Sequence, residues 1–316
     1  DLVPRPDGGA VLYREVWHYV PKTEALVVRA LAPGAAPRYV VMGEPELRRL
    51  AGQVWAPDGR AIGYGTQAER AGTDVDDDAA ARWEMRLVEP DAADPPSTDR
   101  RLFALDAAAV GSNALTLTAW LPARARAAVL EVPADGGPIA AVRIYDTATG
   151  RLEARQALGG GDPLVAPSPD GRRVAWLDAA VGVGIVDVAT GDRRVLVPPS
   201  PDLAAGVPLA LSWSVDGRHL AWAVAPPLDG PGADGALQLG AGRFGGRPIG
   251  RRSAGRAAIG EALVLLAVAP DGRQALALGG EPDDAPGGWW LSLDGRRPPR
   301  RLPLPAVPWA MAWWGE

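Results

Sequence analysis

Short stretches of alternating apolar and polar residues recur along the chain, each bounded by a turn sequence. Examples are PLALSW at 208–213, ALTLTA at 114–119 and HLAWAV at 219–224. Alternation with a period of two is typical of β-strands that bury one face, and no segment shows the period of an amphipathic helix. The pattern therefore predicts an all-β protein built from short antiparallel strands.

One Asp-Gly turn returns about every fifty residues, which is the spacing of a structural repeat. Its aspartates are Asp7, Asp58, Asp170, Asp216 and Asp271. The interval between the second and third is about twice as long as the others. We therefore expect a degenerate copy within it, at 120–124, where WLPAR keeps the Trp and Pro and lacks the Asp-Gly pair. In such turns the aspartate bonds its own backbone and the glycine takes a positive φ.

Each repeat supplies four short strands, because a tight turn such as DTATG at 146–150 opens a fourth strand. This spacing predicts the blades of a β-propeller. We expect six four-stranded antiparallel blades in a single domain, 1–316, with seven blades as the alternative. The opening DLVPR is too short for a good innermost strand, so we expect both chain ends to share one blade and close the ring. The predicted blades are 1–42 with 308–316, 47–105, 113–158, 163–198, 207–250 and 261–304.

Tryptophan outnumbers phenylalanine by 12 to 2, and the repeat explains this bias. Trp55, Trp120, Trp213 and Trp313 occupy equivalent places before the turn. Large aromatic side chains at one register position of a repeat are typical of core packing. We expect these four to fill the gaps between successive blades.

The repeat resembles the TolB-like, or WD40-like, β-propeller repeat, with the pattern W-[AS]-P-D-G-[KR]-x-[IL]-[AV]-[FWY]. The matching segments are Trp55–Tyr64, Pro167–Trp176, Trp213–Trp222 and Val268–Leu276. The resemblance implies a propeller fold over essentially the whole chain. It implies no single activity, because such propellers include envelope proteins that bind partners, propellers that gate peptidases, and sugar lyases with histidine-rich metal sites. This chain holds only His18 and His219, and no residues remain for a hydrolase domain.

Composition excludes several classes of function. The chain has 316 residues, no cysteine and a formal net charge of −5. Thiol chemistry and disulfides are excluded, and a nucleic acid partner is not expected from an acidic chain. No apolar run is long enough to span a membrane. Because the sequence begins at Asp1, we expect a mature or trimmed product. We also expect a monomer that acts outside the cytoplasm, in the periplasm, the envelope or the medium.

The variable loops should gather on one face of the disc, where the second strand of each blade joins the third. Binding sites usually lie on such loops. Three loops carry aromatic or acidic groups, and the expected binding residues are Trp17, His18, Tyr19, Asp76, Asp77, Asp78, Asp283 and Asp284. If the ring closes as expected, these loops are neighbours. Aromatic rings flanked by carboxylates suit a basic peptide or protein, and a solvated rim is the alternative.

No catalytic residue, metal site or cofactor is expected. The run Asp74–Asp78 lacks the glycine and glutamate of a calcium loop. His219 falls at a strand position of the repeat, and no G-x-S-x-G segment is present. We therefore expect a non-catalytic binding propeller that recognises a peptide or protein on its loop-rich face. The alternatives are a hydrolase or lyase with its site at the central channel mouth, and a spacer domain of a larger envelope protein.

Overall fold

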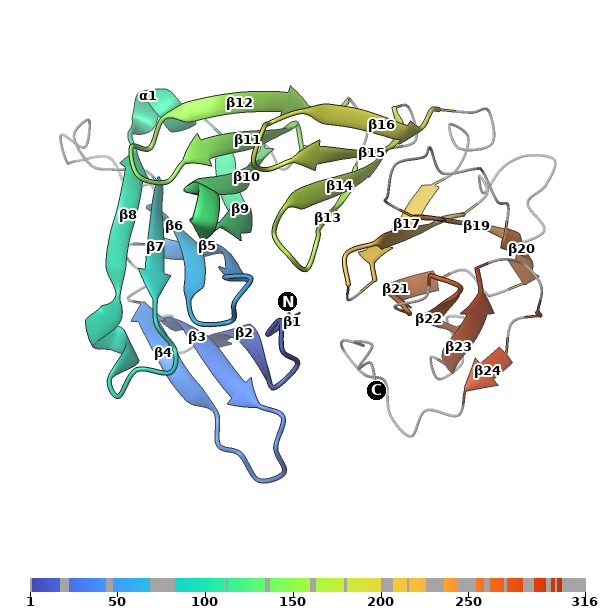
Figure 1. Ribbon diagram of the computed structural model, residues 1–316, viewed down its shortest axis with the longest axis horizontal. Helices are drawn as coiled ribbons and strands as arrows, with labels where there is room; N and C mark the ends of the chain where they lie inside the picture. Colours follow the sequence, from blue (N-terminus) through green and yellow to red (C-terminus); the bar gives the residue numbers. More distant parts are fainter. Residues whose placement is uncertain are drawn as a thin grey trace. The chain divides into compact units, whose positions relative to one another are not determined.

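Strands make up nearly all of the regular structure. The computed structural model describes residues 2–17, 23–43, 48–68, 83–111, 113–133, 137–159, 163–178, 181–199, 207–214, 216–225, 236–243, 254–258, 262–269, 272–280, 287–293, 297–298 and 300–302. Within them, strands in chain order pair into four-stranded sheets, six in all (Figure 1). The prediction of an all-β fold with four-stranded antiparallel blades is confirmed.

The chain divides into two compact units. The first comprises Asp1–Ala157 with the short segments Asp170–Arg172 and Asp187–Asp192, and the second comprises the remaining residues. The first unit holds three sheets. Their strands are β1 (Leu2–Pro4), β2 (Ala10–Trp17), β3 (Thr23–Ala30) and β4 (Arg38–Gly43); β5 (Arg48–Trp55), β6 (Ile62–Ala68), β7 (Trp83–Val88) and β8 (Arg100–Leu105); and β9 (Ala114–Leu121), β10 (Arg126–Val132), β11 (Ala141–Asp146) and β12 (Leu152–Ala157).

The second unit holds three sheets of the same design. Their strands are β13 (Leu164–Pro167), β14 (Arg173–Asp178), β15 (Gly182–Asp187) and β16 (Arg193–Val197); β17 (Val207–Trp213), β18 (His219–Ala225), β19 (Ala236–Arg243) and β20 (Ala254–Ala258); and β21 (Ala262–Val268), β22 (Gln274–Gly280), β23 (Gly287–Ser292) and β24 (Arg300–Leu302). The fifth sheet thus extends past residue 250, where its predicted blade ended. A parallel bridge between Ser214 and Val268 joins the fifth sheet to the sixth.

The first sheet is complete without the C-terminal segment. We expected DLVPR to be too short for an innermost strand, but Leu2–Pro4 forms β1 and pairs with β2. Three residues suffice because Val3 also accepts a hydrogen bond from the indole Nε1 of Trp55, in the next sheet, at 3.1 Å. The segment 308–316, which we expected to share this sheet, lies outside the described residues.

Within each unit, apolar side chains from successive sheets form a shared core. In the first unit, Leu12, Leu26 and Val28 of the first sheet pack with Tyr64 of the second. The opposite face of the second sheet packs through Trp83, Met85 and Phe103 on the third sheet; this core comprises Val54, Ala56, Trp83, Met85, Leu87, Phe103, Leu105, Val110, Leu115, Leu117, Trp120, Ala127, Val129 and Tyr145. Packing face on face is what a sheet with two apolar faces requires.

The tryptophans of the repeat lie in these cores. Trp55, Trp120 and Trp213 are all buried. Trp213 donates to the carbonyl of Ala166 in the preceding sheet at 3.0 Å, just as Trp55 donates to Val3. The indole N–H of Trp120 has no such partner in the structure. Trp120 is therefore equivalent to Trp55 and Trp213 in its packing but not in its hydrogen bonding. The predicted packing role is confirmed for these three, and Trp313 lies outside the described residues.

The Asp-Gly turn has the geometry that its sequence predicts. Its glycines have φ between +65° and +74°; they are Gly8, Gly59, Gly171, Gly217 and Gly272. In the first four turns, Oδ1 of the aspartate accepts the backbone N–H two residues on, at 2.8–3.1 Å. At the degenerate copy, a 3-10 helix (Pro122–Arg124) replaces the turn, and Ala125 takes the positive φ, +49°.

One connection differs from the prediction. We expected a tight turn between the third and fourth strands of every sheet, as at Asp146–Gly150 and Asp187–Gly191, where the glycine N–H bonds the aspartate carbonyl at 2.8 Å. In the second sheet, residues 89–99 form a longer excursion that contains a 3-10 helix, Pro95–Thr98. Its prolines at 90, 95 and 96 cannot continue a strand ladder, which explains the departure.

Candidate functional site

Each sheet has a turn end and a loop end, and the two differ in character. The turn end carries the Asp-Gly turns and the connection between the third and fourth strands. The loop end carries the connection between the second and third strands and the crossing to the next sheet. By the bounds of the strands, the connections at the loop end between second and third strands are 18–22, 69–82, 133–140, 179–181, 226–235 and 281–286.

The turn end is occupied by contacts among the turns themselves. In the first unit, a Cβ placed on Gly59 would lie 3.2 Å from the side chain of Arg5. A Cβ on Gly171 would lie 2.7 Å from the carbonyl oxygen of Trp120 and 3.7 Å from Pro57. The turns of the first unit therefore pack closely on one another at this end.

The predicted binding residues belong to connections at the loop end. Trp17 is the last residue of β2 and pairs with Thr23, so it belongs to a strand and not to a loop, contrary to our expectation. The strand continues because Glu15 and Val16 pair with Ala25 and Glu24 in β3. The other seven predicted residues lie outside the described residues; they are His18, Tyr19, Asp76, Asp77, Asp78, Asp283 and Asp284.

Buried carboxylates, which the sequence pattern does not reveal, lie near the loop end. Among the described residues, four acidic side chains are buried: Glu24, Glu84, Glu131 and Asp178. Each stands within two residues of a connection between second and third strands, in the first, second, third and fourth sheets respectively. Burying a charge is costly unless it is paired or hydrogen-bonded, so each position needs a partner.

Glu24 ties the first sheet to the second. It is 3% exposed, and its Oε2 accepts the backbone N–H of Leu50 at 2.9 Å. Arg14 donates to the backbone carbonyl of Leu50 at 3.2 Å. Leu50 borders a bulge in β5, where Gly52 has a φ of +89°. Two side chains of the first sheet therefore hold the bulged start of the next innermost strand.

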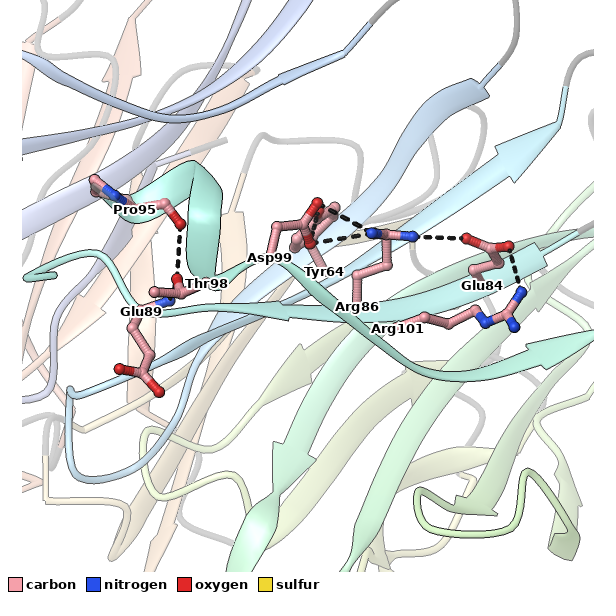
Figure 2. Close-up of polar contacts among 8 residues, drawn as sticks. All are labelled: Tyr64, Glu84, Arg86, Glu89, Pro95, Thr98, Asp99 and Arg101. Atoms are coloured by element: carbon pink, nitrogen blue, oxygen red, sulfur yellow. Dashed lines mark hydrogen bonds and ion pairs between the residues drawn. The ribbon is translucent and has the colours of Figure 1, made fainter.

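Glu84 belongs to a chain of polar contacts across β6, β7 and β8, drawn in Figure 2. Its carboxylate accepts from Arg86 at 3.2 Å and from Arg101 at 3.4 Å. Arg86 also donates to both oxygens of Asp99, at 3.1–3.3 Å, and the Tyr64 hydroxyl donates to Asp99 at 2.6 Å. Asp99 comes from the excursion 89–99, which anchors the network to the turn end.

These contacts shift the pKa of two groups in the network, Tyr64 and Arg86. Burial, and then the hydrogen bond to Asp99, raise the pKa of Tyr64 well above its ordinary value. Burial disfavours the charge of Arg86, but its hydrogen bonds and its attraction to Asp99 outweigh this and raise its pKa. Two carboxylates thus face two guanidinium groups, and the phenol stays neutral. Such a network is suited to holding strands together and not to proton transfer at neutral pH.

Glu131 is the centre of a third cluster, in the third sheet. Its Oε2 accepts from Arg143 Nε and Arg155 Nε, each at 2.8 Å, and its Oε1 accepts from Arg155 Nη2 at 3.1 Å and from Asn113 Nδ2 at 2.8 Å. The two hydrogen bonds from Arg155, and then the one from Arg143, outweigh the effect of burial and lower the pKa of Glu131 to about 2. Tyr145 accepts a further bond from Arg143 at 3.3 Å.

The innermost strands carry almost no titratable chemistry. Across β1, β5, β9, β13, β17 and β21, the charged residues are Arg48 and Arg49 at the start of β5. A channel-mouth enzyme needs a nucleophile or an acid–base pair converging on these strands. The described innermost strands offer neither a carboxylate nor an imidazole.

Histidine and acidic residues do not assemble a metal centre in the described part of the chain, where no group of three His, Cys, Asp or Glu comes together. His219 lies in β18, as its register predicts. Its ring packs against Gly272, since a Cβ there would lie 2.3 Å from the ring. His18 lies outside the described residues. No helix of the described stretches is long and apolar enough to cross a membrane.

Comparison with protein-family models gives no match, and no curated protein sequence matches the chain. Solved structures do match, over nearly all of it. An oligogalacturonate lyase from Vibrio parahaemolyticus matches with a TM-score of 0.61 and 12% identity, covering 98% of this chain and 78% of that one. A chain of the mitotic checkpoint complex matches with a TM-score of 0.57 and 13% identity, covering 97% and 77%. The chain has the fold of a β-propeller.

The TolB-like or WD40-like propeller that the repeat predicts is thus confirmed as a fold. TolB from Acinetobacter baumannii is also among the matching structures, with a TM-score of 0.46 and 14% identity, covering 93% of this chain. The propeller described here spans 61% of the length of that TolB chain. At such low identities the likeness concerns the path of the chain and not its chemistry.

Proposed function

We propose that this propeller is a non-catalytic binding protein that recognises a peptide or protein at its loop end. The observation that carries the proposal is the position of the four buried carboxylates, all beside loop-end connections. A buried ion pair is weak evidence for stability, and in some proteins such pairs fix the conformation of the elements around them. The turns at the opposite end already pack on one another.

The partner we propose is basic. The connection 69–82 contains Asp76, Asp77 and Asp78, and 281–286 contains Asp283 and Asp284. The connection 18–22 adds His18 and Tyr19, and Trp17 ends the strand before it. Carboxylates and aromatic faces both attract arginine and lysine. An acidic chain with a net charge of −5 also favours the approach of a cationic partner. We place this activity outside the cytoplasm.

An enzyme is the second candidate, because an oligogalacturonate lyase is among the matching structures. In that case the site would lie at the channel mouth and act on an uncharged or anionic substrate beside Arg48 and Arg49. The composition of the innermost strands opposes this reading, since a lyase needs a base that these strands do not supply.

We also propose the finer architecture, six blades in one ring with both chain ends in one blade. Support comes from the six four-stranded sheets and from the apolar sequence PWAMAWW at 308–314, which follows the last described strand. A strand that bridges the two ends of the chain would remove an exposed sheet edge.

A peptide-binding measurement tests the proposed function. The probes are a labelled peptide of alternating arginine and glycine and one of alternating glutamate and glycine. We expect the arginine peptide alone to bind, and a triple variant, Asp76→Asn, Asp77→Asn and Asp78→Asn, to weaken it about tenfold, as loss of several exposed charges would. The readout is fluorescence anisotropy at low and physiological salt.

The matched control removes the same charge at the turn end. Glu89→Gln, Asp91→Asn and Asp94→Asn replace three exposed acids of the excursion 89–99. This variant should bind like the parent protein. Equal weakening in both variants would show attraction to overall charge without a site, and absence of binding by the arginine peptide would refute the basic partner.

A further inference from the structure

The excursion 89–99, between the third and fourth strands of the second sheet, reaches the neighbouring first sheet. The same connection in the third and fourth sheets is a tight turn, Asp146–Gly150 or Asp187–Gly191, which closes on its own backbone. The excursion leaves β7 at Val88 and enters β8 at Arg100. A connection of this length can extend past the sheet that it serves.

Both ends of the excursion are fixed to the second sheet. Asp99 accepts the hydroxyl of Tyr64, in β6, at 2.6 Å. Thr98 joins this end to the beginning of the excursion. Its Oγ1 accepts the backbone N–H of Glu89 at 2.9 Å and donates to the carbonyl of Pro95 at 2.7 Å (Figure 2). The residues between the two ends therefore start from a fixed base.

Two arginines of the first sheet bond to the middle of the excursion. Arg38, the first residue of β4, donates from Nη2 to the carbonyl of Ala92. Arg5, in the turn between β1 and β2, donates from Nη1 to Oδ2 of Asp91 at 3.4 Å. The excursion of one sheet thus contacts both the first turn and the outermost strand of the other.

The fold of the first sheet presents both arginines to the second sheet. Arg38 pairs with Val28, whose side chain packs in the core that the two sheets share. Residues directly opposite each other on adjacent strands place their side chains on the same face. The guanidinium of Arg5 is held by Asp7 at 2.8 Å and lies 5.9 Å from the centre of the Trp55 ring. Neither contact therefore depends on a freely rotating side chain.

The two bonds differ in strength. The side chain of Asp91 is 70% exposed, and an exposed ion pair contributes little because water screens it. The carbonyl of Ala92 belongs to a half-buried residue and accepts from a charged donor, which makes the stronger bond. This bond reaches β4, the last strand of its sheet, whose neighbour there is β3 alone. A strand at that position gains more from an outside contact than a central strand does.

We propose that the excursion 89–99 is a strap that fastens β4 to the second sheet at the turn end, with Arg38 as its main attachment and Arg5 as the second. When the strap opens, the outer edge of the first sheet is released while the second sheet stays folded, because the base of the strap is bonded to the second sheet. The proposal concerns the turn end and does not depend on the function proposed for the loop end.

Hydrogen exchange of the full-length protein tests the strap from both sides. Arg38→Met removes the guanidinium and keeps an apolar chain. It should speed exchange about fivefold in both 38–43 and 90–94, the change expected from losing a charge-assisted hydrogen bond. Thr98→Val removes the side-chain bonds that close the base of the strap. It should also speed exchange in both segments, because a strap loosened at its base holds β4 less firmly.

The matched control is Arg29→Met, which makes the same chemical change at an exposed position of β3. It should leave both segments unchanged, and no variant should alter exchange in 141–157 of the third sheet. If Arg38→Met does not fold, Arg38→Lys, which keeps the charge without the forked guanidinium, is measured under the same criteria.

Three results would overturn the proposal. Faster exchange in 38–43 alone after Arg38→Met would show that this arginine acts within its own strand. Faster exchange in 90–94 alone after Thr98→Val would show that the excursion does not hold β4. An equal rise in 141–157 would show a loss of overall stability in place of an opened strap.

Discussion

At the Asp-Gly turns, two adjacent residues determine the backbone conformation. The aspartate carboxylate accepts an N–H two residues on, and the glycine occupies a φ that other residues reach only with strain. Both effects act within four residues, so the sequence alone predicts them. Ala125 shows the limit of this logic, because a non-glycine residue takes the positive φ where the Asp-Gly pair is missing.

Gly171→Val should destabilise the protein. Its φ is +66°, and a Cβ would meet the Trp120 carbonyl at 2.7 Å. Backbone strain and this clash together should lower the free energy of unfolding by about 3 kcal/mol, measured by urea denaturation. Gly34→Val is the control, since Gly34 has a φ of +77° with nothing within 4 Å of its Cβ. Equal losses in both variants would show that the contact with Trp120 contributes nothing.

Tyr64→Phe should cost about 1–2 kcal/mol of unfolding free energy at neutral pH, the value of a buried hydrogen bond to a charged acceptor. The hydroxyl donates to Asp99 at 2.6 Å. The pKa of Tyr64 is raised in the folded protein. The stability that its hydroxyl contributes to the fold is therefore complete below the ordinary pKa of tyrosine and is lost as the pH rises above that pKa. Urea denaturation from pH 7 to 11 should show the two proteins converging, and parallel curves would contradict this origin.

The Tyr64 network could not be predicted from the sequence. Tyr64 and Asp99 are 35 residues apart, and they meet only because the excursion 89–99 folds back over the sheet. No local motif marks such a contact. The burial of the four carboxylates could not be predicted from the sequence for a related reason. A glutamate at the edge of an alternating strand has the pattern of a solvated residue, and its burial depends on the neighbouring sheet.

At the scale of elements, period-two alternation predicted the strands and their grouping in fours. It failed where an element is stabilised from outside its own sequence. Leu2–Pro4 forms a strand of three residues because it pairs with β2 and because Trp55 bonds to Val3. The strand β2 continues to Trp17, past the point where an aromatic and acidic sequence suggested a loop. Tertiary pairing decides the ends of strands more than composition does.

Acid should weaken the third sheet through Glu131. Its pKa is lowered to about 2 from an ordinary 4.5, so its contribution is present above pH 4.5 and is lost as the pH falls toward 2. The parent protein should therefore be more stable than Glu131→Gln at neutral pH, with the difference shrinking to near zero at pH 2. Denaturation midpoints measured across this range give the answer, and a constant difference would show that the charge of Glu131 is immaterial.

At the scale of the whole molecule, the repeat was sufficient to predict the fold, because the blades of a propeller are defined by their spacing and need no particular side chain. Topology supports the proposed binding face, since the bounds of the strands place the variable connections at one end of each sheet. Individual binding residues could not be tested this way, because seven of the eight lie in connections outside the described residues.

Ring closure can be tested by crosslinking, since the chain has no cysteine of its own. Val3→Cys combined with Met311→Cys should form a disulfide under mild oxidation if both chain ends share a blade, and the product should migrate faster on a non-reducing gel. Val3→Cys combined with Ala254→Cys, in the outer strand β20, is the control pair. Failure of the first pair, or equal reaction of both pairs, would count against closure by the chain ends.

The buried carboxylates also constrain how the protein can be altered in the laboratory. A library intended to redirect recognition could vary the connections 18–22, 69–82 and 133–140 freely, provided that Glu24, Glu84 and Glu131 are kept unchanged. Each grafted sequence would then begin and end at strand positions whose conformation the retained carboxylates hold. Libraries that include those three positions should contain many more insoluble clones.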